Sequence, residues 1–219
     1  NFENIAEHWI QMQEYLNLGT KGNIFVKTHN AMCTINGNKF TNKQNSLGAI
    51  YIVRDPRDII ISYSNFLKKS YDEVAAYLFN SESFELSNID GKQFDFTLIG
   101  SWSDNYNSWK NYKTIEVLII KYEDLISDTQ NTFTKIIKYL NKIDNIKIDD
   151  EKIKSCINLT SFKNLRKIEE EKGFIEKGFG EFFFRKGKVG DWKEKLNQDL
   201  VKKIEEKFKL EMKELGYID

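Results

Sequence analysis

Two short segments, far apart in the chain, carry side chains suited to binding an anion. Arg54 follows the apolar run 49–53, and Ser62 stands eight positions after it. The second segment reads FRKGKVGDWK from residue 184, where Arg185, Lys186 and Lys188 stand beside two glycines. A guanidinium matches two phosphate oxygens at once, and glycine lets backbone N–H groups approach an anion closely. These residue types predict a phosphate site.

Other groups with useful chemistry also follow apolar runs. Lys27 and His29 come at the end of one short run, and Tyr122 closes the run 115–122. In an open α/β sheet, ligands bind beyond the carboxyl ends of the strands. We therefore expect these residues and Arg54 at one edge of a sheet. There an imidazole, whose ordinary pKa is close to neutral, could serve as a general base.

Each candidate also has an ordinary structural explanation. Arg54 could pair only with Asp55 or Asp58, and Ser62 could face solvent. A lone histidine or a strand-end lysine is more often structural than catalytic, and a short basic run is usually a solvated loop. Trp192 argues against full exposure of the second segment, because a large aromatic side chain tends to anchor its neighbours.

The elements that must position these residues follow an α/β pattern. Apolar runs at 23–27, 49–53 and 115–122 predict three buried strands. Asp55 and Pro56 suit the N-cap and the first position of a helix. Helices are expected at 2–16, 56–68, 71–79, 98–112, 129–140, 149–158, from 161 and at 198–215. The expected fold class is α/β, with a mainly parallel central sheet flanked by helices.

Three segments are expected to lie outside these elements. The polar, Asn-rich residues 34–47 predict a loop, and residues 80–97 predict a long exposed connection. Residues 172–190 hold five of the twelve glycines among aromatic and charged residues. That composition favours an irregular segment that faces a ligand.

Composition narrows the classes of function. The 219 residues include 33 Lys and Arg and 33 Asp and Glu, a balance that argues against nucleic acid as a partner. Two distant cysteines fit a reducing compartment, and we expect a cytoplasmic protein. With two histidines in no ligand spacing, no metal site is expected. No apolar run is long enough for a membrane span.

Six motifs, in this order, resemble those of the cytosolic-type sulfotransferases, which use 3′-phosphoadenosine 5′-phosphosulfate (PAPS). They are VKTH at 26–29, YIVRDPRDIIISYSNF at 51–66, GSWSDNYNSW at 100–109, IIKYEDL at 119–125, TSF at 160–162 and FRKGKVGDWK at 184–193. The resemblance covers about residues 23–193. It implies a sulfotransferase fold, similar to that of P-loop nucleotide kinases, in one domain over residues 1–219.

The resemblance also implies roles. Five residues would bind the 3′-phosphate of the donor: Arg54, Ser62, Arg185, Lys186 and Gly187. Three would contact the adenine: Tyr122, Thr160 and Phe162, the last by stacking on the ring. His29 would take the proton from a small-molecule acceptor, Lys27 would stabilise charge on the sulfuryl group, and Phe66 would line the acceptor pocket. The product would be 3′-phosphoadenosine 5′-phosphate (PAP), and no metal would be needed.

Two family motifs are not matched. The loop that binds the 5′-phosphosulfate, resembling YPKSGTTW, has no counterpart in residues 1–22, and the first residue is not Met. We therefore expect the chain to lack the N-terminal strand and loop of the fold. The dimer motif, resembling KxxxTVxxxE, is also absent from residues 193–202, so that dimer is not expected.

Two functions stay open. The first is PAPS-dependent transfer of a sulfuryl group to a hydroxyl or amine of a small acceptor. The second is a truncated or degenerate homologue that binds a 3′,5′-bisphosphate nucleotide without catalysis. A nucleotide kinase would need GxxxxGK[ST], which does not occur. The aromatic residues of the irregular segments do not select one acceptor.

Overall fold

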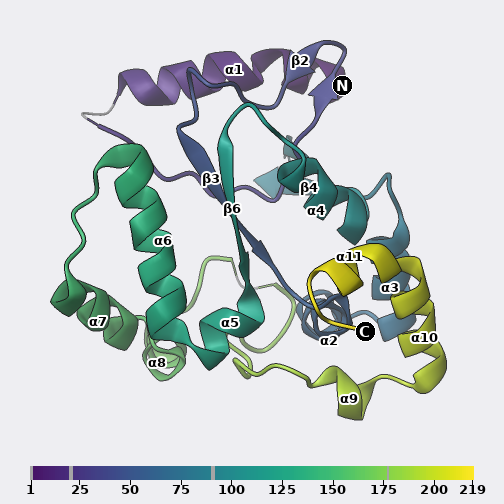
Figure 1. The fold of residues 1–219 in the computed structure, drawn as a ribbon. Coiled ribbons are helices and arrows are strands. Elements are labelled where there is room, and N and C mark those ends of the chain that lie inside the picture. Colours follow the sequence, from purple (N-terminus) through teal and green to yellow (C-terminus); the bar gives the residue numbers. More distant parts are fainter. Residues whose placement is uncertain (1, 20–21, 90–91, 177) are drawn as a thin grey trace. The chain divides into compact units, whose positions relative to one another are not determined.

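This computed structural model describes residues 2–19, 22–89, 92–176 and 178–219. Figure 1 shows its central pair of strands. Strands β3 (Gly48–Val53) and β6 (Glu116–Lys121) pair in a parallel sheet flanked by helices. Both strands are rich in β-branched residues, and Val53 and Ile120 are buried. The predicted fold class and these two predicted strands are confirmed.

The chain divides into two compact units. The first contains Asn1–Tyr51, Leu78–Ile119 and Ile143–Asn145. The second contains Ile52–Tyr77, Ile120–Lys142 and Ile146–Asp219. Strands β3 and β6 each begin in the first unit and end in the second, so the residues that follow both strands belong to the second unit.

The third predicted strand, at 23–27, is wrong. Residues 22–31 form neither helix nor strand. Ile24, Phe25 and Val26 are 37%, 73% and 67% exposed. An apolar run becomes a buried strand only where a neighbour supplies hydrogen bonds and a second layer covers its side chains. This run has no such cover within the described residues of its unit.

The expected connection at 80–97 is also wrong. Strand β4 (Phe84–Ile89) pairs antiparallel with β5 (Lys92–Leu98), with a register shift between Ser87 and Asn88. The sequence carries alternating apolar and polar residues on both sides of an Asp-Gly pair, a hairpin signal that the sequence analysis passed over. A smaller hairpin, β1 (Thr34–Ile35) with β2 (Asn38–Lys39), forms inside the predicted 34–47 loop.

Aromatic side chains form the core of the first unit. Helix α4 (Trp102–Lys110) is capped by Ser101 in a capping box and buries three aromatic side chains. The ring of Phe40 lies 6.3 Å from that of Trp109 and 5.3 Å from that of Trp9 on helix α1 (Phe2–Leu18). The predicted helix at 98–112 is thus shorter than expected, because its first residue ends β5.

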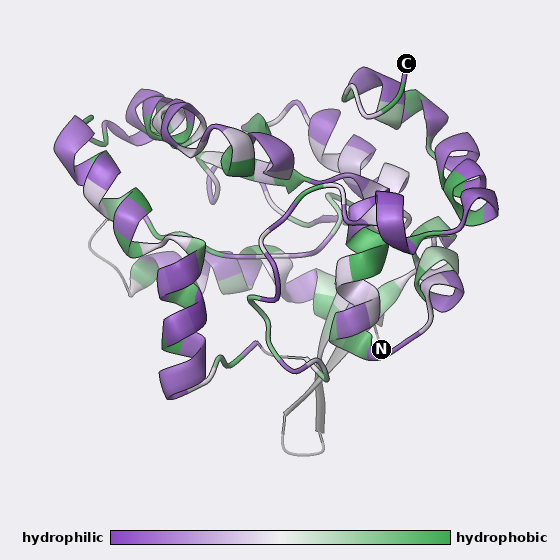
Figure 2. Cartoon of the chain, turned by 90° about the horizontal axis from the view of Figure 1, so that it is seen from below, coloured by the Kyte–Doolittle hydropathy of each residue, from purple (hydrophilic) through white to green (hydrophobic). Residues whose placement is uncertain are grey.

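Helix α2 (Pro56–Leu67) lies at the centre of the second unit. Asp55 caps it, with Pro56 in the first turn, as predicted. Helix α10 (Gln198–Lys207) packs against α2 with Leu200 and Ile204 buried. The remaining helices are α3 (Tyr71–Phe79), α5 (Tyr122–Ser127), α6 (Thr129–Asp144), α7 (Asp150–Leu159), α8 (Phe162–Lys172), α9 (Trp192–Lys195) and α11 (Lys209–Glu214). Figure 2 shows hydrophobic and hydrophilic residues interspersed along the helices, as expected of amphipathic packing.

The predicted C-terminal helix at 198–215 is two helices, because the chain breaks at the fully buried Phe208. The described residues of 173–190 contain no helix or strand, so that segment is irregular as predicted. Among the helices that the structure describes, none has the length and hydropathy required to cross a bilayer.

Candidate functional site

Arg54 joins three parts of the second unit. It follows β3, and its Nη2 donates a hydrogen bond of 3.1 Å to the carbonyl of Lys188. Its guanidinium carbon lies 4.3 Å from the centroid of the Tyr122 ring, where the cation meets the π face. The end of β3, the residue after β6 and residues 184–193, here called the basic glycine segment, therefore meet. Of the four residues predicted at one edge of the sheet, Arg54 and Tyr122 lie together.

Asp58 tethers the basic glycine segment to α2. Its carboxylate accepts hydrogen bonds from the backbone N–H groups of Gly190 at 2.6 Å and Trp192 at 3.1 Å. Asp58 is 1% exposed, so both N–H groups satisfy a buried charge. Truncation of this side chain would leave two backbone donors without their partner.

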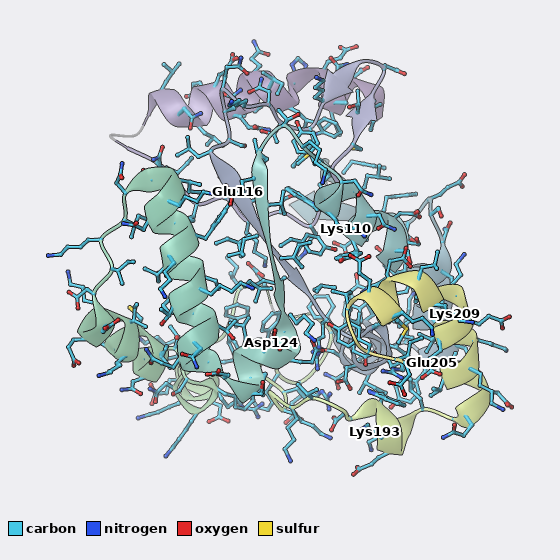
Figure 3. All side chains as sticks on the ribbon, in the orientation of Figure 1. Lys110, Glu116, Asp124, Lys193, Glu205 and Lys209 are labelled. Carbon is cyan, nitrogen blue, oxygen red and sulfur yellow. The ribbon has the colours of Figure 1, made fainter. Side chains whose placement is uncertain are left out.

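Arg57 is the buried arginine of the RDPRD motif. It forms an ion pair of 2.6 Å with Asp55 and a second pair with Glu205, which Figure 3 labels on α10. Its guanidinium carbon lies 3.8 Å from the Trp192 ring centroid. Burial opposes its charge, but the hydrogen bonds to Asp55 and Glu205 outweigh this effect and raise the pKa of Arg57. Arg57 thus links α2 to α9 and α10.

Tyr217 connects the C-terminal residues to Glu123 and to Arg57 at the start of α2. The hydroxyl of Tyr217 donates to Glu123 at 2.8 Å, and the other oxygen of Glu123 accepts the N–H of Asp55 at 3.0 Å. The Tyr217 carbonyl accepts a hydrogen bond from Arg57 at 2.9 Å. Burial and the Glu123 carboxylate raise the pKa of Tyr217, so its hydroxyl stays a donor.

Gly187 and Phe162 lie in direct contact. Gly187 has a φ of +59°, and a Cβ there would lie 2.5 Å from Cδ2 of Phe162. Only glycine fits, both for the backbone conformation and for the approach of the ring. Phe162 is 39% exposed, so part of its ring is open to a ligand. The preceding Thr160 is exposed and donates its hydroxyl proton to the carbonyl of Cys156 at 2.7 Å.

Arg185 and Lys186 share one carboxylate. The Lys186 ammonium lies 2.7 Å from the same Asp191 oxygen that Arg185 approaches at 3.4 Å. The hydrogen bond from Lys186, with the charge of Arg185, lowers the pKa of Asp191. Both cations are partly exposed, so they can also face an anion from solvent. Gly187 therefore stands between cations held by Asp191 and the ring of Phe162.

Ser62 lies on the face of α2 that contacts the glycine-rich segment, the described residues of 173–190. Asp58, Ser62 and Phe66 follow at intervals of four residues and so share one helix face. Asp58 holds Gly190, and the Phe66 carbonyl accepts the N–H of Phe179 at 2.8 Å. Ser62 is half-buried between these two contacts. Ser62 therefore stands one helical turn from each of these two contacts on the same helix face.

Phe66 is itself in contact with the glycine-rich segment, since a Cβ on Gly178 would lie 2.5 Å from Cδ2 of its ring. A cavity of about 730 Å³ lies beside this contact. Three polar side chains, two glycines and one phenylalanine line it: Asn65, Lys68, Glu181, Gly178, Gly180 and Phe179. Phe66 does not belong to this lining, so the cavity differs from the apolar acceptor wall expected around Phe66.

Lys27 and His29 belong to the first unit, whereas the residues above belong to the second. Both are exposed. The chain after them is anchored by the buried Asn30, whose carbonyl accepts the Trp109 indole N–H at 3.0 Å and whose Oδ1 accepts the N–H of Leu98 at 2.8 Å. Asn30 fixes the backbone that carries His29, although no strand does.

Sequence reasoning missed residues that position the candidate residues within each unit. They are Asn30, Arg57, Glu123, Asp191 and Tyr217, with Asp58 considered only as a partner of Arg54. Arg57, Glu123 and Asp191 are charged residues inside the motifs RDPRD, YEDL and GDW, so their position in the sequence next to predicted residues could have indicated them. No feature of the sequence indicated Tyr217. In the part of the chain that the structure describes, no three His, Cys, Asp or Glu residues cluster in the manner of a metal site.

Comparisons with known proteins point to one family. The family model described as "Sulfotransferase domain" matches residues 10–216. The chain is 27% identical to amine sulfotransferase of Oryctolagus cuniculus over 181 residues, 78% of this chain and 56% of that protein. It is 31% identical to cytosolic sulfotransferase 12 of Arabidopsis thaliana, over 76% of this chain and 52% of that protein. The chain spans about half the length of these relatives.

Solved structures agree in fold. A retinol dehydratase bound to retinol and PAP matches with a TM-score of 0.62 at 20% identity, over 94% of this chain and 62% of that one. A mouse sulfotransferase bound to PAP matches with a TM-score of 0.58 at 22% identity, over 78% and 60%. At these identities the likeness shows the shared fold.

Proposed function

Because this chain belongs to the sulfotransferase family, we propose that it transfers a sulfuryl group from PAPS to a hydroxyl or amine of a small-molecule acceptor. The single observation that carries the proposal is the contact between Arg54 and the carbonyl of Lys188. That contact joins the two segments expected to bind the 3′-phosphate. The match to residues 10–216 supports one sulfotransferase domain as the acting unit.

The residues of the second unit fit a nucleotide with a 3′-phosphate. Arg54, Arg185 and Lys186 supply cations, and Ser62 and Gly187 would supply a hydroxyl and a backbone donor. The close approach of Phe162 to Gly187 supports this fit, since a side chain at 187 would displace the ring that is expected to stack on the adenine. Both solved structures described above hold PAP.

The adenine would lie against an aromatic wall. The exposed part of the Phe162 ring would stack on the base. Tyr122 and Thr160 would contact the edge of the base. Arg54, which lies over the Tyr122 ring, would then place the proposed phosphate site next to the adenine site. Phe66 would take part in the acceptor site through its contact with the glycine-rich segment.

PAPS would supply the sulfuryl group, and His29 would remove the proton from the acceptor. Imidazole suits this role at neutral pH, and general base catalysis contributes about a hundredfold to ten-thousandfold to a rate. Lys27 would stabilise negative charge on the transferring group. The cations and hydrogen-bond donors named above need no metal for these steps, so we expect the reaction to proceed without one. The relatives that include a cytosolic enzyme favour a cytoplasmic site of action.

The alternative function is binding of the nucleotide at the same donor site without transfer of the sulfuryl group. An assay with labelled PAPS and three acceptors, a phenol, a steroid alcohol and an amine, distinguishes transfer from binding alone. We expect labelled product to form slowly with one of these classes, because the loop that binds the 5′-phosphosulfate has no counterpart in residues 1–22. His29→Ala should lower kcat by at least about a hundredfold, with PAP affinity retained. PAP binding with no transfer to any acceptor would favour the alternative. Neither binding nor transfer by the folded chain would overturn both.

A further inference from the structure

A cavity of about 500 Å³ lies in the first unit, and none of the residues assigned above belongs to its lining. Three segments line it: the loop before β3, the end of α4, and the link into β6. The lining residues are Lys43, Ser46, Leu47, Lys110, Tyr112, Lys113, Thr114, Ile115, Glu116 and Val117. It includes the first residues of β6, whereas Tyr122 follows the last residue of that strand.

The cavity is rich in positive charge. Three lysines line it against one carboxylate, Glu116. Figure 3 labels Lys110 on α4 and Glu116 on β6. The Lys113 ammonium donates to the carbonyl of Lys110 at 3.4 Å, which keeps it near the end of the helix. An anion that reaches this cavity meets cations from two separate segments, because Lys43 comes from the loop before β3.

Lysines at a helix C-terminus have an ordinary role, since they complement the partial negative charge of the last carbonyls. That role accounts for Lys110 and Lys113. It does not account for Lys43, which lies 67 positions before Lys110 and is brought to the same cavity by the fold. The convergence of Lys43 with Lys113 is therefore the observation that needs another explanation.

The rest of the lining is suited to a molecule with both polar and apolar parts. Thr114 offers a hydroxyl group. The hydroxyls of Ser46 and Tyr112 are held by Thr41, at 2.7 Å to its hydroxyl and 2.8 Å to its carbonyl. Leu47, 51% exposed, and Val117 provide apolar surface beside them. The volume lies in the range of small-molecule sites, about 300–1,000 Å³.

We propose that this cavity binds a small organic anion, a sulfate or phosphate monoester on an apolar body. Lys43 and Lys113 hold the ester oxygens, and Leu47 and Val117 contact the apolar part. None of its lining residues belongs to the proposed donor site, and the proposal does not depend on the proposed sulfotransferase activity. If that activity is correct, a sulfated product is one source of such a ligand and a phosphate monoester is another.

The probes are phenyl sulfate, phenyl phosphate, inorganic sulfate and phenol, titrated by calorimetry at low salt. At least one of the two phenyl esters should bind about tenfold more tightly than both phenol and inorganic sulfate, which each lack one part of the ligand. Comparison of the two esters identifies the preferred headgroup. Inorganic sulfate binding as tightly as the better ester would overturn the apolar half of the proposal. Phenol binding equally well would overturn the anionic half.

The variant Lys43→Ala/Lys113→Ala tests the assignment to this cavity. Both lysines are exposed, so the fold should persist, and the ester affinity should fall about tenfold. Lys39→Ala, on an exposed lysine of the same unit, is the matched control and should bind as the unchanged chain does. Unchanged affinity in the double variant would overturn the proposal. So would ester binding that survives there and is lost in Arg54→Ala/Arg185→Ala, since it would belong to the donor site.

Discussion

Asp58 accepts the backbone N–H of Gly190 at 2.6 Å, and this bond ties the first turn of α2 to the basic glycine segment. The same carboxylate holds the N–H of Trp192. Arg54, four residues before Asp58, contacts the segment at Lys188. The proposed binding of a phosphate by two distant segments is favoured by such a tether, because without it their cations would have to be ordered when the ligand binds.

Replacing Asp58 with alanine should loosen the tether. Two N–H groups would lose a buried acceptor, which costs roughly 2–4 kcal/mol of unfolding free energy. Urea unfolding measures that loss, and calorimetry should show weaker PAP binding. Asp72→Ala, at an exposed first-turn position of α3, is the matched control and should change neither quantity. If Asp58→Ala fails to fold, Asp58→Asn, which keeps one acceptor, should give an intermediate effect. Full stability and affinity in Asp58→Ala would contradict the tether.

Gly187→Ala should damage the donor site through the ring of Phe162. The new Cβ would lie 2.5 Å from Cδ2 of Phe162, so the ring must move from its place. We expect PAP affinity to fall by about tenfold or more. Gly173→Ala shares a positive φ, at +74°, but meets nothing within 4 Å, so it isolates the backbone strain. Equal loss in both variants would assign the effect to strain and not to the ring.

Tyr217→Phe should uncouple the C-terminal residues from the strand end. The change removes one hydroxyl, which donates to Glu123, and leaves the ring in place. A hydrogen bond to a carboxylate contributes roughly 1.5–3 kcal/mol, and the unfolding free energy should fall by about that amount. Tyr15→Phe, on a largely exposed residue, should change it by less than about 0.5 kcal/mol. A loss no larger than that of Tyr15→Phe would show that Glu123 does not depend on this bond.

The lowered pKa of Asp191 predicts that the free energy of unfolding decreases at acidic pH. Its pKa is lowered below the ordinary value of 3.8, first by the hydrogen bond from Lys186. A carboxyl group of this kind stabilises the fold above its unfolded pKa, and the contribution is lost as pH falls through its lower folded value. Asp191→Asn should therefore be less stable than the unchanged chain at neutral pH. The difference between their unfolding free energies should shrink below about pH 4; a difference constant down to pH 2 would contradict this.

Local chemistry made much of the site predictable. Asp55 and Pro56 begin α2 as the cap and first-turn preferences require, and Arg54 follows a buried β-branched run. Ser62 was selected because it lies about two turns into the helix after Arg54 and because the segment resembles the family motif, and its role stays a prediction. The resemblance also predicted which segments share a ligand, and this too stays a prediction.

Contacts between distant residues were not predictable. The bonds from Asp58 to Gly190 and from Arg57 to Glu205 join positions whose pairing depends on the whole fold of the second unit. The run at 23–27 has the composition of a strand, but strand formation requires a partner that composition does not reveal. The β4–β5 hairpin was missed for the opposite reason, since its signal was local and was overlooked.

The most direct test of the donor site is calorimetric titration of this chain with PAP, with AMP as the ligand that lacks the 3′-phosphate. PAP should bind at least about tenfold more tightly than AMP, because each charge-assisted hydrogen bond to the phosphate adds roughly 1.5–3 kcal/mol. Arg185→Ala should remove most of that preference. Equal affinity for PAP and AMP in a folded chain would contradict the assignment of Arg54, Ser62, Arg185, Lys186 and Gly187 to a 3′-phosphate.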